Sequence, residues 1–475
     1  MNSKILLINP PTGLYLREDR CQAPVKSMMA QGVRPPMDLA YIAAVCRRDS
    51  SSTCLIKDYP VEGGGWDEFR ALLRDFKPDF LVISTTTPTF QDDMKAAEIA
   101  HEETGNRIKC IAKGAHLSDH DIEALNRYST LDYAVRGESE LIIGDLISGS
   151  DPAQITGLTY RSVSGEVIRN PDRELLENLD ILPEPARDLI RNELYPDPET
   201  GEPLTPVLTS RGCSGQCIFC PVFLVSGKRI RKRSVSSITS EIDSCVNNYG
   251  IRSFLFRSDT FTIDKQWVIE LCRSISESGH AIRWGANSRV DTFDEERADA
   301  MARAGCYIVS FGVESGSPEM LTKMKKNINL DDVSRSVNLC RKHGILSMLY
   351  FVIGLPWETW DTISETVEFA KRIPADFYEI HSAYPFPGTP LYELGLREDL
   401  FCEHDLEKGN YFLPVMNTYH LTREEIARER KKALISIYMR PSIIWRTLKR
   451  IRSCRKLWRY TTFGLSKFIN LKENR

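Results

Sequence analysis

The first 148 residues alternate short apolar runs with longer stretches whose apolar residues recur at helical spacing. Short buried strands separated by helices predict a parallel, doubly wound α/β sheet. The predicted strands are residues 5–8, 54–56, 80–83, 108–111 and 133–135, and the helices between them include 37–48 and 91–101. In such sheets ligands bind beyond the carboxyl ends of the strands. Here those ends carry polar loops near Pro10, Ser84 and Lys113.

Residues 204–400 repeat the alternation in six successive strand–helix units. Six such units predict a partial barrel of the TIM type, with its chemistry at the carboxyl ends of the strands. The predicted strands are 206–208, 254–256, 282–286, 307–311, 348–353 and 378–381. Residues 149–203 are predicted to be a connector with a hairpin around Ser164-Gly165, and residues 401–475 a helical C-terminal segment.

Composition narrows the class of protein. The chain has 475 residues, 42% hydrophobic and 27% charged, which is typical of a globular protein of about three domains. The odd number of 13 cysteines predicts reduced thiols, some of them metal ligands, rather than a disulfide framework. No run approaches the roughly 18 apolar residues that a membrane-spanning helix needs. The first residues show no secretory leader pattern, so we expect a cytoplasmic protein.

Charge is distributed unevenly along the chain. Residues 421–475 hold 16 Lys/Arg and 4 Asp/Glu, whereas the whole chain has a net charge of −3, so residues 1–420 are acidic. Basic and apolar residues alternate at near-helical spacing around Trp445 and Trp458. This pattern is typical of a helical cap with a solvated basic face, of a helix docked on anionic lipid at the inner face of a membrane, or of a nucleic-acid surface. Of these we expect no nucleic-acid partner.

Three cysteines follow the first strand of the second region in C-x3-C-x2-C spacing: Cys213, Cys217 and Cys220. Chance gives this spacing in roughly one of a hundred chains with this cysteine content. A structural zinc site normally has four ligands, and no second ligand pair follows. A four-iron four-sulfur (4Fe-4S) cluster held by three thiolates leaves one iron without a protein ligand, open to a cofactor. The spacing therefore favours such a cluster over zinc.

The cysteine segment resembles the signature of the radical S-adenosylmethionine (SAM) superfamily, in which an aromatic residue, here Phe219, precedes the last cysteine. The resemblance implies that Cys213, Cys217 and Cys220 ligate the cluster and that the amino and carboxylate groups of S-adenosyl-L-methionine bind the open iron. It also implies reductive cleavage of SAM to a 5'-deoxyadenosyl radical, which abstracts hydrogen from an unactivated carbon. Such chemistry needs a low-potential electron donor such as ferredoxin or flavodoxin.

The later strand ends carry residues that fit a SAM site in the same family. By resemblance, the SAM contacts are Ser258 near the methionyl amine, Ser288 and Arg289 at ribose and carboxylate, Glu314 at the ribose hydroxyls and Gly354 in the adenine-contact turn. Three of these have a structural alternative: a plain turn at Ser258, an ion pair at Arg289, or a buried, paired carboxylate at Glu314. Their order along successive strand ends favours the SAM site.

The first region resembles the cobalamin-binding subclass of this superfamily. The resemblance rests on Asn9-Pro10-Pro11 and on residues 35–43 and 135–138. It implies that cobalamin lies between the domains, near Pro10, Ser84, Lys113 and Gly114. Two departures stand out: none of the 8 histidines occupies the D-x-H-x-x-G pattern that supplies a cobalt ligand elsewhere, and Lys113 replaces one glycine of a usual pair. Lys113 either reaches a phosphate of the cobalamin tail or marks a domain that has lost its cofactor.

These resemblances imply a radical enzyme that methylates an unactivated carbon of a small hydrophobic or lipid-like molecule through cobalamin. One alternative keeps the radical but uses it for rearrangement, oxidation or carbon–carbon coupling without functional cobalamin. A second alternative is a non-catalytic iron–sulfur protein for electron transfer, which has little use for nucleoside-binding turns at Glu314 and Gly354.

Overall fold

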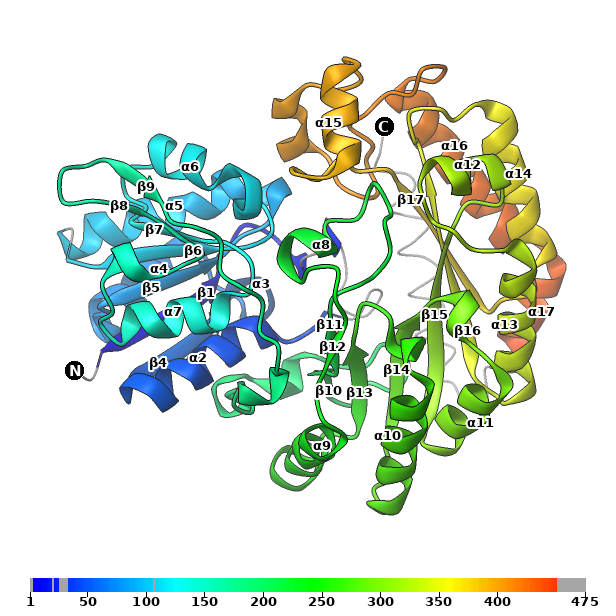
Figure 1. The fold of residues 1–475 in the computed structure, drawn as a ribbon, viewed down its shortest axis with the longest axis horizontal. Coiled ribbons are helices and arrows are strands. Elements are labelled where there is room, and N and C mark those ends of the chain that lie inside the picture. The colour runs from blue at the N-terminus through cyan, green and yellow to red at the C-terminus, as the bar shows by residue number, and fades with distance from the viewer. Residues whose placement is uncertain (1–2, 19–20, 25–32, 106, 451–475) are drawn as a thin grey trace.

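The computed structural model describes residues 3–18, 21–24, 33–105 and 107–450, whose two large sheets, both mainly parallel, stand side by side (Figure 1). The chain that connects the two sheets passes between them, and the short helix α8 (Val222–Val225) also lies there. No helix in the described ranges is long and apolar enough to cross a membrane.

The first sheet has seven strands in the order β4-β1-β5-β6-β7-β8-β9. The first five are parallel, and the last two form an antiparallel hairpin at one edge. Their bounds are β1 Lys4–Asn9, β4 Thr53–Asp58, β5 Phe80–Ser84, β6 Lys109–Lys113, β7 Tyr133–Val135, β8 Leu158–Arg161 and β9 Val167–Arg169. The order of the strands reverses between β1 and β5, which is where ligands bind in this topology. The predicted hairpin is confirmed, and it extends this sheet past residue 148.

Helices cover both faces of the first sheet because successive strand residues point to opposite sides. In β1, Ile5 and Leu7 pack into one core, while Leu6 and Ile8 pack into the other. Helices α2 (Met37–Ser50) and α7 (Ser139–Ile147) supply the first core, and α4 (Trp66–Phe76), α5 (Phe90–Thr104) and α6 (Leu117–Arg127) the second. The remaining elements of this region are α3 Tyr59–Glu62 and the small ladder of β2 Tyr15–Glu18 with β3 Cys21–Pro24.

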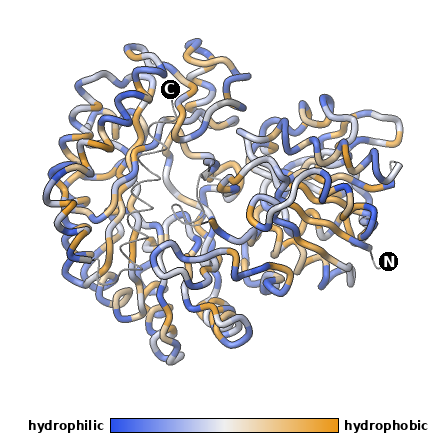
Figure 2. Tube along the Cα trace, turned by 180° about the vertical axis from the view of Figure 1, so that it is seen from behind, coloured by the Kyte–Doolittle hydropathy of each residue, from blue (hydrophilic) through white to orange (hydrophobic). Residues whose placement is uncertain are grey.

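The second sheet has six parallel strands in chain order and curves into a partial barrel. The strands are β10 Leu204–Leu208, β13 Ser253–Arg257, β14 Arg283–Ser288, β15 Cys306–Glu314, β16 Leu346–Ile353 and β17 Phe377–Ser382. The outer layer is α9 Val235–Tyr249, α10 Lys265–Glu277, α11 Glu295–Arg303, α12 Pro318–Lys323, α13 Leu330–Lys342 and α14 Trp360–Arg372. Their core includes Phe256 stacked on Trp284 with ring centroids 4.4 Å apart. The predicted partial barrel is confirmed, and Figure 2 shows apolar and polar stretches alternating along the outer helices.

The C-terminal part of the chain packs beside the last barrel strands. It contains α15 Pro390–Arg397, a 3-10 turn at Glu403–Lys408, α16 Arg423–Tyr438 and α17 Pro441–Arg450. Helix α16 buries Ile426, Leu434 and Ile437 in the barrel core, as a helical cap would. On α17 the side chains of Ile444, Trp445 and Leu448 are exposed. The second tryptophan of the predicted basic segment, Trp458, lies outside the described residues.

Candidate active site

The three cysteines lie on one loop at the carboxyl end of β10. A two-residue antiparallel ladder closes this loop at its base, where β11 (Ser210–Arg211) pairs with β12 (Arg231–Lys232). Gly212 has a φ of +90°, and a Cβ atom there would lie 2.0 Å from the carbonyl oxygen of Arg229, so only glycine fits. We call residues 212–230 the cysteine loop.

Two of the thiols on this loop lie close to Gly215. A Cβ atom placed on Gly215 would lie 3.3 Å from Sγ of Cys213 and 3.9 Å from Sγ of Cys217, and the three cysteines are half-buried and reduced. Burial raises the pKa of Cys217, while Lys326 and Arg289 act in the opposite direction. Half-buried thiols on one short loop, with cationic neighbours, fit an inorganic cluster held by thiolates.

Glu314 ends β15 with a φ of +69°, a conformation that is uncommon for a residue other than glycine. Its carboxylate accepts a hydrogen bond from Nζ of Lys326 at 2.7 Å, and both side chains are buried. A Cβ atom on Gly312 would lie 2.4 Å from Oε1 of Glu314 and 2.9 Å from Nζ of Lys326, so glycine leaves the room for this pair. The paired carboxylate that was one interpretation of Glu314 is what the structure shows, and Lys326 is a site residue that sequence reasoning missed.

The neighbouring strand ends bring Ser258, Ser288 and Arg289 to the same edge of the barrel. The hydroxyl of Ser258 bonds that of Ser210 at 2.6 Å, and the hydroxyl of Ser288 bonds that of Thr262. Both serines are buried.

Arg289 links the barrel edge to the cysteine loop. It pairs with Asp291 at 2.8 Å and donates to the carbonyl oxygen of Asn327 at 3.3 Å. Its Nη1 lies 3.8 Å from the Cβ position of Gly215. The structural ion pair considered for Arg289 is therefore present, and it holds the guanidinium beside the cysteine loop.

The turn after β16 begins at Gly354, which has a φ of +90°. The carboxylate of Glu358 accepts hydrogen bonds from the backbone N–H groups of Gly354 and of Leu355, the latter at 3.0 Å. Glu358 is fully buried, and burial raises its pKa to about 7. Among the described residues its Oε1 has no hydrogen-bond partner. The carboxyl group therefore stabilises the backbone of this turn, which the family resemblance implies is the turn that contacts adenine.

A cavity lies between the carboxyl edge of the first sheet and the cysteine loop. It encloses about 1020 Å³ that protein atoms do not fill, part of it open to solvent. The first sheet contributes Lys113 and Gly114 to its lining, and the barrel contributes Arg257 and Ser258. A cavity shared by two domains is a typical place for a cofactor that lies between them.

Lys113 and Gly114 have local roles at this edge. Lys113 is buried and pairs with Asp38 of α2. Gly114 has a φ of +149°, and a Cβ atom there would lie 2.4 Å from the carbonyl oxygen of Thr85, so the packing of the loops already requires glycine. Pro10 directly follows β1, and Ser84 is the last residue of β5, as expected. Neither residue lines this cavity.

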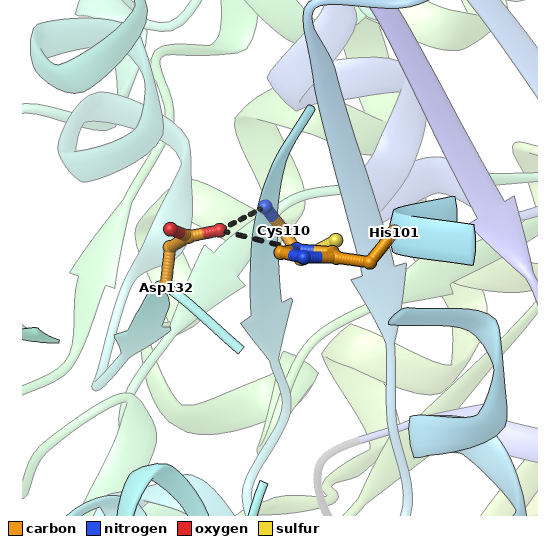
Figure 3. Close-up of side chains that lie close together, drawn as sticks. All are labelled: His101, Cys110 and Asp132. Atoms are coloured by element: carbon orange, nitrogen blue, oxygen red, sulfur yellow. Dashed lines mark hydrogen bonds and ion pairs between the residues drawn. The ribbon is translucent and has the colours of Figure 1, made fainter. Parts of the chain in front are cut away.

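A second group of potential metal ligands lies at the opposite, amino end of the first sheet (Figure 3). His101, Cys110 and Asp132 place their ligand atoms within 4.8 Å of one another. Both carboxylate oxygens of Asp132 are already engaged, one by Nζ of Lys109 at 2.7 Å and the other by the backbone N–H of Cys110 at 2.9 Å. Burial holds the pKa of Cys110 well above its usual value. We assign this group a structural role.

Comparison with known proteins identifies the family. The sequence profile of the radical SAM superfamily matches residues 207–370, and that of the B12 binding domain matches residues 29–147. An uncharacterized methyltransferase of Pyrococcus horikoshii is 33% identical over 445 residues, which cover 93% of this chain and 94% of the relative. The chain belongs to the radical SAM superfamily. Its place is among the members whose barrel follows a B12-binding domain, so it is a radical SAM enzyme.

Two further proteins are similar to this chain, one in sequence and one in fold. The anaerobic magnesium-protoporphyrin IX monomethyl ester cyclase of Rubrivivax gelatinosus is 25% identical over 402 residues, 82% of this chain and 71% of the relative. The structure of the cobalamin-dependent SAM radical enzyme OxsB with aqua-cobalamin and SAM bound superposes with a TM-score of 0.71 at 16% identity, covering 99% of this chain and 72% of that one. The likeness confirms the predicted order of a doubly wound domain and a partial barrel. The family's cofactors, a 4Fe-4S cluster, SAM and cobalamin, are those expected from the sequence.

Proposed function

We propose that this enzyme is a cobalamin-dependent methyltransferase that methylates an unactivated carbon of a small molecule. The observation that carries the proposal is the cavity between the two domains, because Lys113 and Gly114 of the first sheet line it together with Val222, Val225 and Ser226 of the cysteine loop. The relative from Pyrococcus horikoshii, which bears a methyltransferase name, aligns over nearly the whole chain and supports the same chemistry.

Cys213, Cys217 and Cys220 are proposed to hold the cluster, with Phe219 beside the last of them. A cluster held there would supply the electron for the reductive cleavage of SAM. Arg289 and Lys326 give this edge of the barrel positive charge close to Cys217, which suits the carboxylate of an amino acid chelated at the open iron.

Four groups on the barrel edge are proposed to hold the nucleoside. Glu314 offers a carboxylate for the ribose hydroxyls, and Gly354 begins the turn for the adenine. Ser258 and Ser288 complete the set as buried hydroxyls near the cysteine loop and the ribose. The ion pair between Lys326 and Glu314 orients that carboxylate before SAM arrives.

Lys113 and Gly114, which line the shared cavity, are proposed to border the cobalamin, which would supply methyl transfer between SAM and the substrate carbon. Lys113 lines the shared cavity, where its ammonium group is paired with Asp38. We propose that Lys113 serves a phosphate of the cobalamin tail from this position. No histidine of the sequence stands in the motif that would supply a lower cobalt ligand.

The proposed reaction balances with two electrons from an external donor of the ferredoxin or flavodoxin type. One SAM loses its methyl group and leaves as S-adenosylhomocysteine. The other accepts the substrate hydrogen on its 5' carbon and leaves as 5'-deoxyadenosine and methionine. The substrate exchanges one C–H bond for one C–CH3 bond.

The test is isotopic. The reduced, cobalamin-loaded enzyme is incubated anaerobically with SAM that carries a trideuterated methyl group and with extracted metabolites, and products are followed by mass spectrometry. The proposal expects a metabolite that gains one trideuteromethyl group, with S-adenosylhomocysteine and 5'-deoxyadenosine formed in equal amounts. Formation of 5'-deoxyadenosine and a modified metabolite without the label would instead support ring formation, as in the cyclase relative.

We also propose that the enzyme works at an anionic membrane surface on a lipid-like substrate. The exposed side chains of Ile444, Trp445 and Leu448 on α17, together with the basic composition of residues 421–475, support this location. Trp445→Ser is expected to lower sedimentation with anionic vesicles severalfold, whereas Trp360→Ser, which changes an exposed tryptophan on α14, is expected to have no effect. Equal sedimentation of both variants and the wild type would contradict the proposed surface.

A further inference from the structure

Two arginines face each other at the base of the cysteine loop. Arg211 of β11 and Arg231 of β12 are directly opposite in the antiparallel ladder, and both guanidinium groups are largely buried. Like charges directly opposite each other destabilise such a pair, and a buried charge without a partner costs more. The ladder that closes the loop therefore needs negative charge from elsewhere in the molecule.

The negative charge comes from the other domain. Glu138 places one carboxylate oxygen 3.2 Å from Arg211 and the other 2.9 Å from Arg231, and Glu140 pairs with Arg211. The side chains of both glutamates are largely shielded from solvent at the start of α7, directly after β7 at the carboxyl edge of the first sheet. We call Arg211, Arg231, Glu138 and Glu140 the junction.

Further hydrogen bonds tie the junction to the connector and to the cysteine loop. Arg231 donates to the carbonyl oxygen of Leu176 at 2.8 Å and to that of Ser226 at 2.7 Å. The backbone N–H of Leu176 donates to Glu138 at 2.9 Å. One buried arginine thus connects the first domain, the connector and the far end of the cysteine loop.

The path from the junction to the first thiol is short and stiff. Arg211 precedes Cys213 by two residues, and Gly212 between them has no room for a side chain. The backbone N–H of Gly212 donates to Asp259 at 2.8 Å, and that of Cys213 donates to the carbonyl oxygen of Gly227 at 3.2 Å. The bond to Asp259 fixes this segment to the barrel, and Arg211 ties the same segment to the first domain.

We propose that the junction sets the position of the cysteine loop relative to the first domain, and that Arg211 and Glu140 are positioning residues for methyl passage between the two cofactor sites. The inference rests on the proposed function. Cleavage of SAM at the cluster involves the barrel alone, whereas methyl transfer joins groups held by different domains and depends on their separation to within about 1 Å. Loosening the junction should therefore slow the second reaction and spare the first.

The decisive variant is Glu140→Gln, which keeps the shape of the side chain but removes its charge. The matched control is Glu177→Gln, which changes an ion pair of the connector with Arg229 at 2.5 Å whose two side chains are 76% and 71% exposed. Both are made in the full-length enzyme loaded with cluster and cobalamin. Release of S-adenosylhomocysteine reports methyl transfer from SAM, and release of 5'-deoxyadenosine reports cleavage. Pulsed electron paramagnetic resonance (EPR) reports the distance between the reduced cluster and cob(II)alamin.

For Glu140→Gln we expect release of S-adenosylhomocysteine to fall at least about tenfold, release of 5'-deoxyadenosine to stay within about twofold, and the distance distribution to broaden. The control should match the wild type in all three readouts. If Glu140→Gln does not fold, Glu140→Asp decides, because it keeps the charge and shortens the reach towards Arg211 by one methylene. An unchanged distance distribution in the variant that folds would overturn the inference. Absence of S-adenosylhomocysteine from the wild type would instead refute the proposed function.

Discussion

At the scale of single residues, the thiols of the cysteine loop differ from the other cysteines in their surroundings. Burial in the barrel core raises the pKa of Cys245, Cys272 and Cys340 to about 12, so these thiols stay protonated. Cys217 is half-buried instead, and Lys326 and Arg289 oppose the rise in its pKa. Cationic neighbours of this kind favour the thiolate that iron requires.

Cys217→Ala is expected to leave the fold intact and to abolish 5'-deoxyadenosine formation, because two thiols do not retain the cluster in a SAM-binding form. Iron analysis and product chromatography measure the two effects. Cys402→Ala, which removes an exposed thiol, is the control, and we expect it to keep the full iron content. Normal turnover in Cys217→Ala would contradict the assignment of the ligands.

Glu358 should give the protein a pH-dependent stability. Burial raises its pKa to about 7 in the folded state, above the ordinary value near 4.3, so its contribution is fully present below pH 4 and is lost as the pH rises towards 7. Relative to Glu358→Gln, which does not titrate, the wild type is expected to lose about 2 to 3 kcal/mol of stability between pH 5 and pH 8. Thermal melting of both proteins across this range measures the difference. An equal change of melting temperature with pH in both proteins would contradict this prediction, because Glu358 would then be ionised in the folded protein over the whole range.

At the scale of elements, the absence of a side chain at a strand end of the barrel leaves room for a buried ion pair. Gly312 is the clearest case, because the pair of Glu314 and Lys326 occupies the space of its missing side chain. The strands themselves follow from the apolar pattern, and all six barrel strands lie where that pattern predicts. The ladder of β11 and β12 has two residues in each strand, too short for any periodicity. Lys326 was also not predicted as a site residue, because the sequence around a lysine does not show which carboxylate it pairs with.

Gly312→Ala is expected to weaken SAM binding about tenfold, because the added methyl group separates Glu314 from Lys326. Equilibrium dialysis with labelled SAM measures the affinity. Gly65→Ala, where the nearest atom to the new methyl group lies 3.6 Å away, is the control and should bind SAM normally. Unaltered affinity in Gly312→Ala would show that the pair does not contribute to the SAM site.

At the scale of the whole molecule, function depends on how two separately recognisable domains meet. The sequence motifs identify each domain, because strand ends and cysteine spacing are local features. The contact between the domains is not local: Arg211 and Glu140 are distant in the chain, and neither belongs to a recognisable motif for pairing. Only the structure shows that the arginines at the base of the cysteine loop take their counter-charges from the B12-binding domain.

The most direct measurement is the product balance of SAM in the anaerobic enzyme supplied with cluster, cobalamin and a low-potential reductant. The account predicts that one protein releases both S-adenosylhomocysteine and 5'-deoxyadenosine. It also predicts that the EPR signal of the reduced cluster changes when SAM is added. Release of 5'-deoxyadenosine alone would contradict methyl transfer. A metal centre that contains zinc, or iron whose signal does not respond to SAM, would contradict the open iron site itself.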